Sequence, residues 1–159
     1  MNDIYSTLDT LRISYKKIEH SAVFTVEEAN TIDRDITAGH SKNLFLKNKK
    51  GTAYYLVVVQ SDKRVDLKQL ANTLAESKLS FASPEKLQEY LGLTPGSVSP
   101  FGLINNTKHD VTVIIDKDLV QQEKVAFHPN INIATLVISV EDFQKFLGWA
   151  GNKIRYLSL

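Results

Sequence analysis

The chain has 159 residues, of which 19 are lysine or arginine and 18 are aspartate or glutamate, so its formal net charge is only +1. This balance does not indicate a general nucleic-acid-binding protein, which is usually strongly basic. Cysteine is absent, which excludes disulfides, a thiolate nucleophile and a cysteine-ligated zinc ion, and makes a cytoplasmic location the default. No run of about 18 apolar residues predicts a membrane-spanning helix, and the first residues lack the character of a signal peptide.

The first part of the chain contains two helical and three strand patterns. Helices are predicted where a capping residue precedes apolar residues at helical spacing, and strands where apolar residues alternate or form a short β-rich run. In chain order these are a helix capped by Asn2, a strand over residues 15–20, a short helix begun by the capping box Thr25–Glu28, and strands over residues 41–46 and 53–60. The last two are joined by Asn48–Gly51, which predicts a hairpin with Gly51 at positive φ.

The rest of the chain continues this mixture and indicates the fold class. In chain order it predicts a helix capped by Asp66, a helix from Pro84 to Gly92, a structured loop over residues 94–100, strands over 111–116, 125–127 and 135–140, a helix over 141–150 and a strand over 153–157. Strands outnumber helices, and several are joined by hairpins rather than by helical crossovers. The sequence therefore predicts an α+β fold with a mixed, largely antiparallel sheet and peripheral helices. No linker or repeat divides the chain, which predicts one domain over residues 1–159.

The common catalytic motifs are absent from the sequence. It contains no G-x-S-x-G, no G-x-x-x-x-G-K-[ST], no G-x-G-x-x-G and no H-E-x-x-H. The histidines have no spacing that is typical of a metal site; they are His20, His40, His109 and His128. We therefore expect neither a metal ion nor another cofactor.

Three short segments combine polar or backbone-donating residues with apolar neighbours at the edge of a predicted strand. They are Ser41–Leu46, Ser99–Asn105 and Phe127–Asn130. Lys42 directly precedes an apolar run, so the strand that buries this run also holds the lysine in place. Gly102 is predicted to lie in a loop where backbone N–H groups could face an oxyanion, and Pro129 confines His128 to an extended backbone. For each of these residues a purely structural role stays open at this point.

Together these segments resemble the YbaK family of prolyl-tRNA editing domains, and within it the free-standing alanyl-tRNA(Pro) deacylases. The resemblance rests on the order and spacing of His20 with Ala22–Ala29, of Ser41–Leu46, of Ser99–Asn105 and of Phe127–Asn130. It implies the fold of that family and hydrolysis of the ester that links a wrong amino acid, above all alanine, to the terminal adenosine of tRNA(Pro). The implied partners are the acceptor end of aminoacyl-tRNA(Pro) and, transiently, prolyl-tRNA synthetase.

The resemblance also implies roles for single residues. The catalytic group is expected to be Lys42, Asn43, Gly102 and His128. The substrate's own vicinal hydroxyl is expected to help, which would explain why no serine, cysteine or metal nucleophile is found. Contacts to the substrate are expected from Phe45, Ser99, Pro100, Phe101 and Asn130. The basic residues of the predicted hairpin are candidates for contact with the tRNA acceptor stem, namely Lys47, Lys49 and Lys50.

Departures from the family pattern leave two alternatives open. Ser21 replaces a common proline, Asn106 a common aspartate, and Ile131 and Ile133 stand where small polar residues are more usual. The last three could reshape the acyl pocket, so the substrate could be a tRNA charged with cysteine, serine or threonine. The other alternative is a non-catalytic tRNA-binding or regulatory module of the same fold. The near-neutral charge argues against it, because a pure binder would need a more basic surface.

Overall fold

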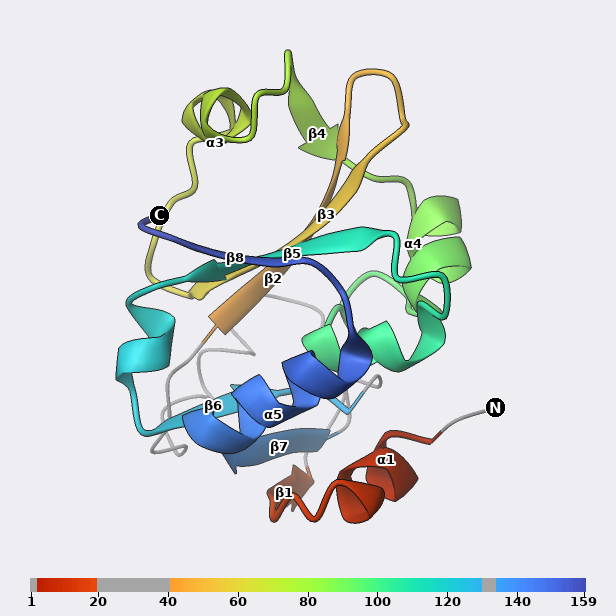
Figure 1. Ribbon diagram of the computed structural model, residues 1–159, viewed down its shortest axis with the longest axis vertical. Helices are drawn as coiled ribbons and strands as arrows, with labels where there is room; N and C mark the ends of the chain where they lie inside the picture. Colours follow the sequence, from red (N-terminus) through yellow and green to blue (C-terminus); the bar gives the residue numbers. More distant parts are fainter. Residues whose placement is uncertain (1–2, 20–40, 130–133) are drawn as a thin grey trace.

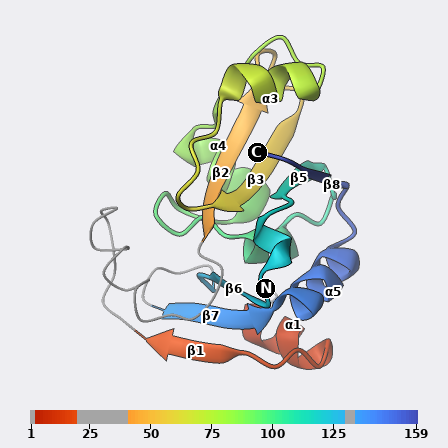
Figure 2. The same cartoon turned by 90° about the vertical axis from the view of Figure 1, so that its left-hand side faces the viewer.

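The computed structural model describes the protein over residues 3–19, 41–129 and 134–159. Within these residues the strands form two sheets, one of five strands and one of three (Figure 1). Figure 2 shows β2 (Ser41–Asn48) and β3 (Tyr54–Gln60) of the larger sheet running nearly vertically, with the smaller sheet lying across their lower end. None of the helices in this part of the chain has both the length and the apolar character that crossing a membrane requires.

The larger sheet has the strand order β4-β2-β3-β5-β8. Its members are β2 (Ser41–Asn48), β3 (Tyr54–Gln60), β4 (Leu79–Phe81), β5 (Val111–Asp116) and β8 (Ile154–Leu157). The predicted hairpin is confirmed, since β2 pairs antiparallel with β3 and Gly51 in the turn has a φ of 68°. β2 also pairs antiparallel with β4, whereas β5 runs parallel to both of its neighbours.

The smaller sheet has the order β1-β7-β6 and is antiparallel throughout. Its members are β1 (Lys16–Glu19), β6 (Lys124–Phe127) and β7 (Ala134–Ser139). Since only the pairings of β5 are parallel, the prediction of an α+β fold with largely antiparallel pairing is confirmed. The strands divide into two sheets rather than one, because β1 pairs with β7 across more than a hundred residues of chain, a partner choice that local patterns do not contain.

Capping residues explain where several of the described helices begin or end. They are α1 (Ile4–Thr10), α3 (Leu67–Thr73), α4 (Pro84–Leu91) and α5 (Val140–Ala150). The predicted cap of α3 is confirmed, since the Asp66 side chain accepts from two backbone N–H groups, and α4 ends at the left-handed Gly92 as predicted. α1 is capped by Asp3 rather than by Asn2, because the carboxylate of Asp3 accepts the N–H of Tyr5. The predicted capping box Thr25–Glu28 lies outside the described residues.

Apolar side chains on the two faces of the larger sheet form two separate cores. The main core lies between the two sheets and includes Phe45, Phe101, Phe127 and Phe146. The second, smaller core lies on the other face under α3 and includes Leu46 and Leu70. Since successive residues of a strand point to opposite faces, each residue of β2 belongs to one side or the other, and this decides where the polar residues at its start project.

Candidate functional site

The three segments that the sequence singled out meet in the structure. The side-chain nitrogen of Asn43, near the start of β2, donates to the backbone oxygen of Val98 at 3.1 Å. The Phe101 ring packs edge-on against the Phe127 ring, with centroids 5.7 Å apart. β2 also lies against β6 (Figure 2). Residues more than fifty positions apart in the chain therefore share one region, where β2 begins and β6 ends.

Asn43 is held on the main-core side of β2. Its register partner on β3 is Val58, a main-core residue. Because the Val98 oxygen can only accept, the amide of Asn43 must turn its nitrogen toward Val98. Its oxygen Oδ1 and the hydroxyl of Ser41, the next residue on that face, are buried and have no hydrogen-bond partner among the described residues. Buried polar atoms are usually paired, so both keep an unused capacity to accept a hydrogen bond.

Lys42 projects from the opposite face of the same strand. Its register partner is Val59, and its neighbours on the same face, Leu44 and Leu46, pack in the second core under α3. At this end β2 has one described strand neighbour, β3, because the pairing with β4 is confined to Leu46–Asn48. The half-buried Lys42 therefore lies on a part of β2 that has no second strand neighbour among the described residues.

His128 follows β6 directly, and a hydrogen bond to a backbone oxygen orients its ring. Its Nδ1 lies 2.9 Å from the backbone oxygen of Ala134. A carbonyl oxygen only accepts, so Nδ1 carries the proton and, in the neutral ring, Nε2 carries the lone pair. The half-buried ring is therefore held in the tautomer that can accept a proton through Nε2.

Gly102 is not in an open loop, and the expectation of free N–H groups at this residue is wrong. It lies buried in a 3-10 helix, η1 (Pro100–Asn105), and its N–H donates to the Ser99 oxygen at 3.0 Å. A Cβ on Gly102 would lie 2.6 Å from a methyl carbon of Leu93. The close approach that requires glycine is therefore to Leu93 inside the protein, and a direct role of Gly102 in catalysis stays a prediction that rests on the family resemblance.

The residues expected to contact the substrate are mostly inside the protein. Phe45 is 5% exposed and stacks on Tyr54, and Phe101 is fully buried. The buried Ser99 hydroxyl accepts the N–H of Phe101 and so caps η1, with Pro100 buried beside it. In this structure these side chains support the site rather than line it, because a buried ring has no surface for a ligand; a part in substrate binding stays a prediction. Asn130 lies outside the described residues.

The lysines expected to contact tRNA lie at the other end of β2. Lys47 is near the end of the strand, and Lys49 and Lys50 are exposed in the hairpin turn. At about 3.3 Å per residue, the turn is about 20 Å from Lys42. Contact of these three residues with tRNA stays a prediction, and it now concerns a part of the tRNA remote from the ester.

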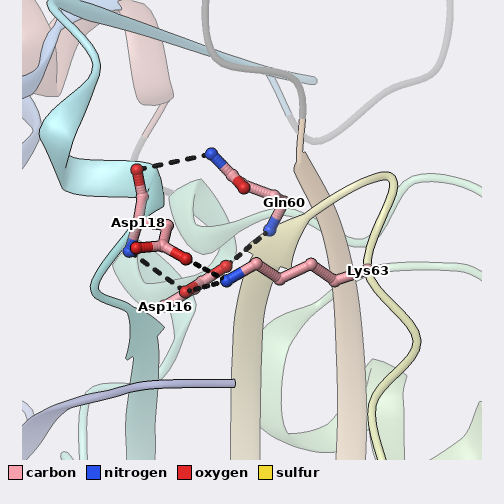
Figure 3. A network of polar contacts seen from close by, with 4 residues as sticks. All are labelled: Gln60, Lys63, Asp116 and Asp118. Atoms are coloured by element: carbon pink, nitrogen blue, oxygen red, sulfur yellow. Dashed lines mark hydrogen bonds and ion pairs between the residues drawn. The ribbon is translucent and has the colours of Figure 1, made fainter.

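A polar network that sequence reasoning missed lies at the end of β5 (Figure 3). Strand register and alternation place it on the face of Lys42. The fully buried carboxylate of Asp116 accepts from Lys63 Nζ at 3.0 Å and from the backbone N–H groups of Gln60, at 3.2 Å, and Asp118, at 3.1 Å. Lys63 also pairs with Asp118. The hydrogen bond to Asp118 is the main cause that raises the pKa of Lys63. The sequence did contain a signal for this network: Asp116 ends one predicted strand, and Lys63 follows the predicted strand that lies beside it.

Asn106, which departs from the family pattern, serves the fold. It is 4% exposed, and its side chain bonds Asp110, the N–H of Val111 and the side chain of Asn152. The expectation that it reshapes the acyl pocket is therefore not supported, since these partners join η1, β5 and the start of β8. Ile131 and Ile133 lie outside the described residues. Among the described residues, no group of three metal-ligating side chains could hold a metal ion.

Comparison with known proteins connects this geometry to a family. The model of the family described as "Aminoacyl-tRNA editing domain" matches residues 20–146. The prolyl-tRNA editing protein ProX of Acetoanaerobium sticklandii is 46% identical over 156 residues, which cover 98% of this chain and 95% of that protein. The prolyl-tRNA synthetase associated domain-containing protein 1 of Bos taurus is 38% identical over 149 residues, 91% of this chain and 86% of that protein. The crystal structure of hypothetical protein APE2540 has the same fold, with a TM-score of 0.74 at 19% identity, covering 96% of this chain and 97% of that chain.

Proposed function

Because this chain belongs to the aminoacyl-tRNA editing domain family, we propose that it is a deacylase that removes alanine from mischarged tRNA(Pro) in trans. The observation that carries the proposal is the meeting of Asn43, η1 and the His128 segment at one end of the larger sheet, inside the region that matches the family. We propose further that residues 1–159 form one editing domain. The partner is the acceptor end of aminoacyl-tRNA(Pro), with prolyl-tRNA synthetase as a transient partner and the cytoplasm as the location.

The chemistry that these residues can supply is hydrolysis of an ester by water. With Nδ1 on the Ala134 oxygen, Nε2 is the other ring nitrogen of His128, and general-base catalysis on the attacking water or a substrate hydroxyl would use it. The ammonium group of Lys42 supplies positive charge for the oxyanion or for the terminal phosphate. Within the described residues Asn43 keeps an unpaired acceptor, Oδ1, at the start of β2, and its part in orienting the substrate rests on the family resemblance. Positioning the ester is most of the work, and this requires no protein nucleophile.

Selection of alanine over proline follows from size. A synthetase site built for proline cannot strongly reject a smaller amino acid, because a missing methylene or two costs only about 1–3 kcal/mol. A second site that admits alanine and excludes proline corrects these errors by hydrolysis.

A panel of aminoacyl-tRNAs tests the proposed function. At equal concentration, the purified protein is expected to release alanine from Ala-tRNA(Pro) and to leave Pro-tRNA(Pro) intact. Faster release of cysteine, serine or threonine would replace the proposed substrate while keeping the enzyme class. Tight tRNA binding without release of any amino acid would instead establish the non-catalytic alternative.

The hairpin end of the larger sheet is the part of the described surface that best fits the tRNA acceptor stem. Lys47, Lys49, Lys50 and Lys78 have no ion-pair partner within the described residues, in contrast to Lys63 and Lys86. They surround β4, an edge strand that carries Phe81, whose side chain is 62% exposed. Lysines neutralise phosphates and an exposed ring can stack on an unpaired base. With a net charge of +1, binding has to come from such a local group.

Removing three of these lysines is expected to weaken tRNA binding in a salt-dependent way. For Lys49→Gln, Lys50→Gln and Lys78→Gln combined, the slope of log affinity against log salt should fall by about 2 to 3, because each phosphate contact contributes about 0.7–0.9. Binding of uncharged tRNA(Pro) at several salt concentrations measures this slope. Lys145→Gln, an exposed lysine on α5, is the control. Equal slopes for the triple variant and wild type would remove the hairpin from the tRNA interface.

A further inference from the structure

Asp116 has a buried carboxylate, and the groups that donate hydrogen bonds to it lie at one end of the larger sheet. Its carboxylate is fully buried and is held by two backbone N–H groups and by Lys63. Figure 3 shows the Lys63 side chain reaching from the loop after β3 to both Asp116 and Asp118. A buried carboxylate that loses its cation is strongly destabilised, so another cation that can reach it would stabilise the protein.

Lys42 lies on the same face of the larger sheet as Asp116, two strands away. Lys42 pairs with Val59 on β3, and Val58 pairs with Ile115 on β5, so Val59 stands between Lys42 and Asp116. Ile114 belongs to the second core, and alternation places Asp116 on the same face. Two strand spacings, about 10 Å between the two Cα atoms, separate the residues. The flexible four-carbon stem of lysine can span most of this gap.

From this arrangement we infer that Lys63 is a positioning residue for Lys42. By pairing with Asp116, Lys63 keeps that carboxylate from pairing with the Lys42 ammonium group, which stays available to the substrate. The inference rests on the proposed function in one respect, that Lys42 acts on the substrate. It explains why a catalytic lysine can project from the face that also holds a buried acid.

Steady-state deacylation of Ala-tRNA(Pro) by a set of variants tests the inference. Lys63→Gln is expected to lower kcat by about tenfold or more, toward the value of a Lys42 variant, because Lys42 turns to Asp116. Adding Asp116→Asn to Lys63→Gln is expected to restore kcat to within about twofold of wild type, since the competing charge is gone. Lys63→Arg should keep full activity. Lys86→Gln, which breaks the exposed ion pair with Glu89, is the matched control and should change nothing.

Two outcomes overturn the inference. One is wild-type kcat in folded Lys63→Gln, and the other is a double variant that stays as slow as Lys63→Gln, which would mean that Lys63 acts by another route. If Lys63→Gln alone does not fold, the double variant, which holds no unpaired buried carboxylate, is compared with wild type, and a kcat more than about twofold below wild type overturns the inference.

A stability measurement decides the inference even if wild type hydrolyses none of the aminoacyl-tRNAs, in which case the proposed function fails separately. Lys42→Met is expected to lower the urea midpoint of the Lys63→Gln protein but not that of wild type, because Lys42 pairs with Asp116 only when Lys63 is gone. If Lys63→Gln is unfolded, the same comparison is made between the Asp116→Asn and Lys63→Gln/Asp116→Asn proteins, where Lys42→Met should have no effect in either. Equal shifts in wild type and Lys63→Gln, or a shift in the double variant, overturn the inference.

Discussion

Replacing Lys42 by alanine is expected to lower the rate of ester hydrolysis by about 100-fold or more while the protein stays folded. Removing a single group that stabilises developing charge typically costs a factor of about 10² to 10³ in rate. The fold should survive because Lys42 is half-buried and has no ion-pair partner among the described residues. Such substitutions usually change the free energy of unfolding by no more than about 0.5 kcal/mol. Single-turnover deacylation and a urea titration measure the two quantities.

Lys47→Ala provides the matched control for this experiment. Lys47 lies on the same strand, is also half-buried and faces the other side of the sheet. It should leave the single-turnover rate at saturating enzyme unchanged. If Lys42→Ala retained a rate close to that of wild type, Lys42 would have no part in the mechanism, and the chemistry would have to come from His128, Asn43 and the substrate hydroxyl.

Replacing Phe101 by alanine is expected to destabilise the fold by about 3–5 kcal/mol, the usual cost of emptying a buried phenylalanine site. The ring is fully buried and packs edge-on against both Phe127 and Phe146, at centroid distances of 5.7 and 5.3 Å. It therefore joins η1 to β6 and α5. The midpoint of guanidinium unfolding should fall sharply with an unchanged slope.

Phe81→Ala is the control for Phe101→Ala, because the same atoms are removed from a ring that is 62% exposed. Its effect on the free energy of unfolding should be about 0.5 kcal/mol or less. The opposite result for Phe101→Ala, a stable protein with a raised KM, would mean that the ring contacts the substrate directly and that packing is its minor role.

The sequence by itself determined the features that depend on neighbouring residues. Asp66 caps α3 and Gly92 ends α4 where predicted, and Gly51 takes the positive φ of the hairpin turn. Each depends on the chemistry of a few consecutive residues, such as a carboxylate that reaches an N–H group two positions on. The family could be recognised for the same reason, since its segments are contiguous strings of residues.

Only the tertiary structure decided which residues lie on the same face of the sheet and which distant residues come into contact. A shift of one position along β2 reverses the face, so the neighbours Lys42 and Asn43 face different cores. Gly102 was expected to expose its N–H, but that N–H donates to the Ser99 oxygen, and Gly102 itself packs against Leu93. The pairing of Lys63 with Asp116 joins residues 53 positions apart. Such contacts depend on strand register and on which strands become neighbours, and these are set by burial across the whole chain rather than by local propensity.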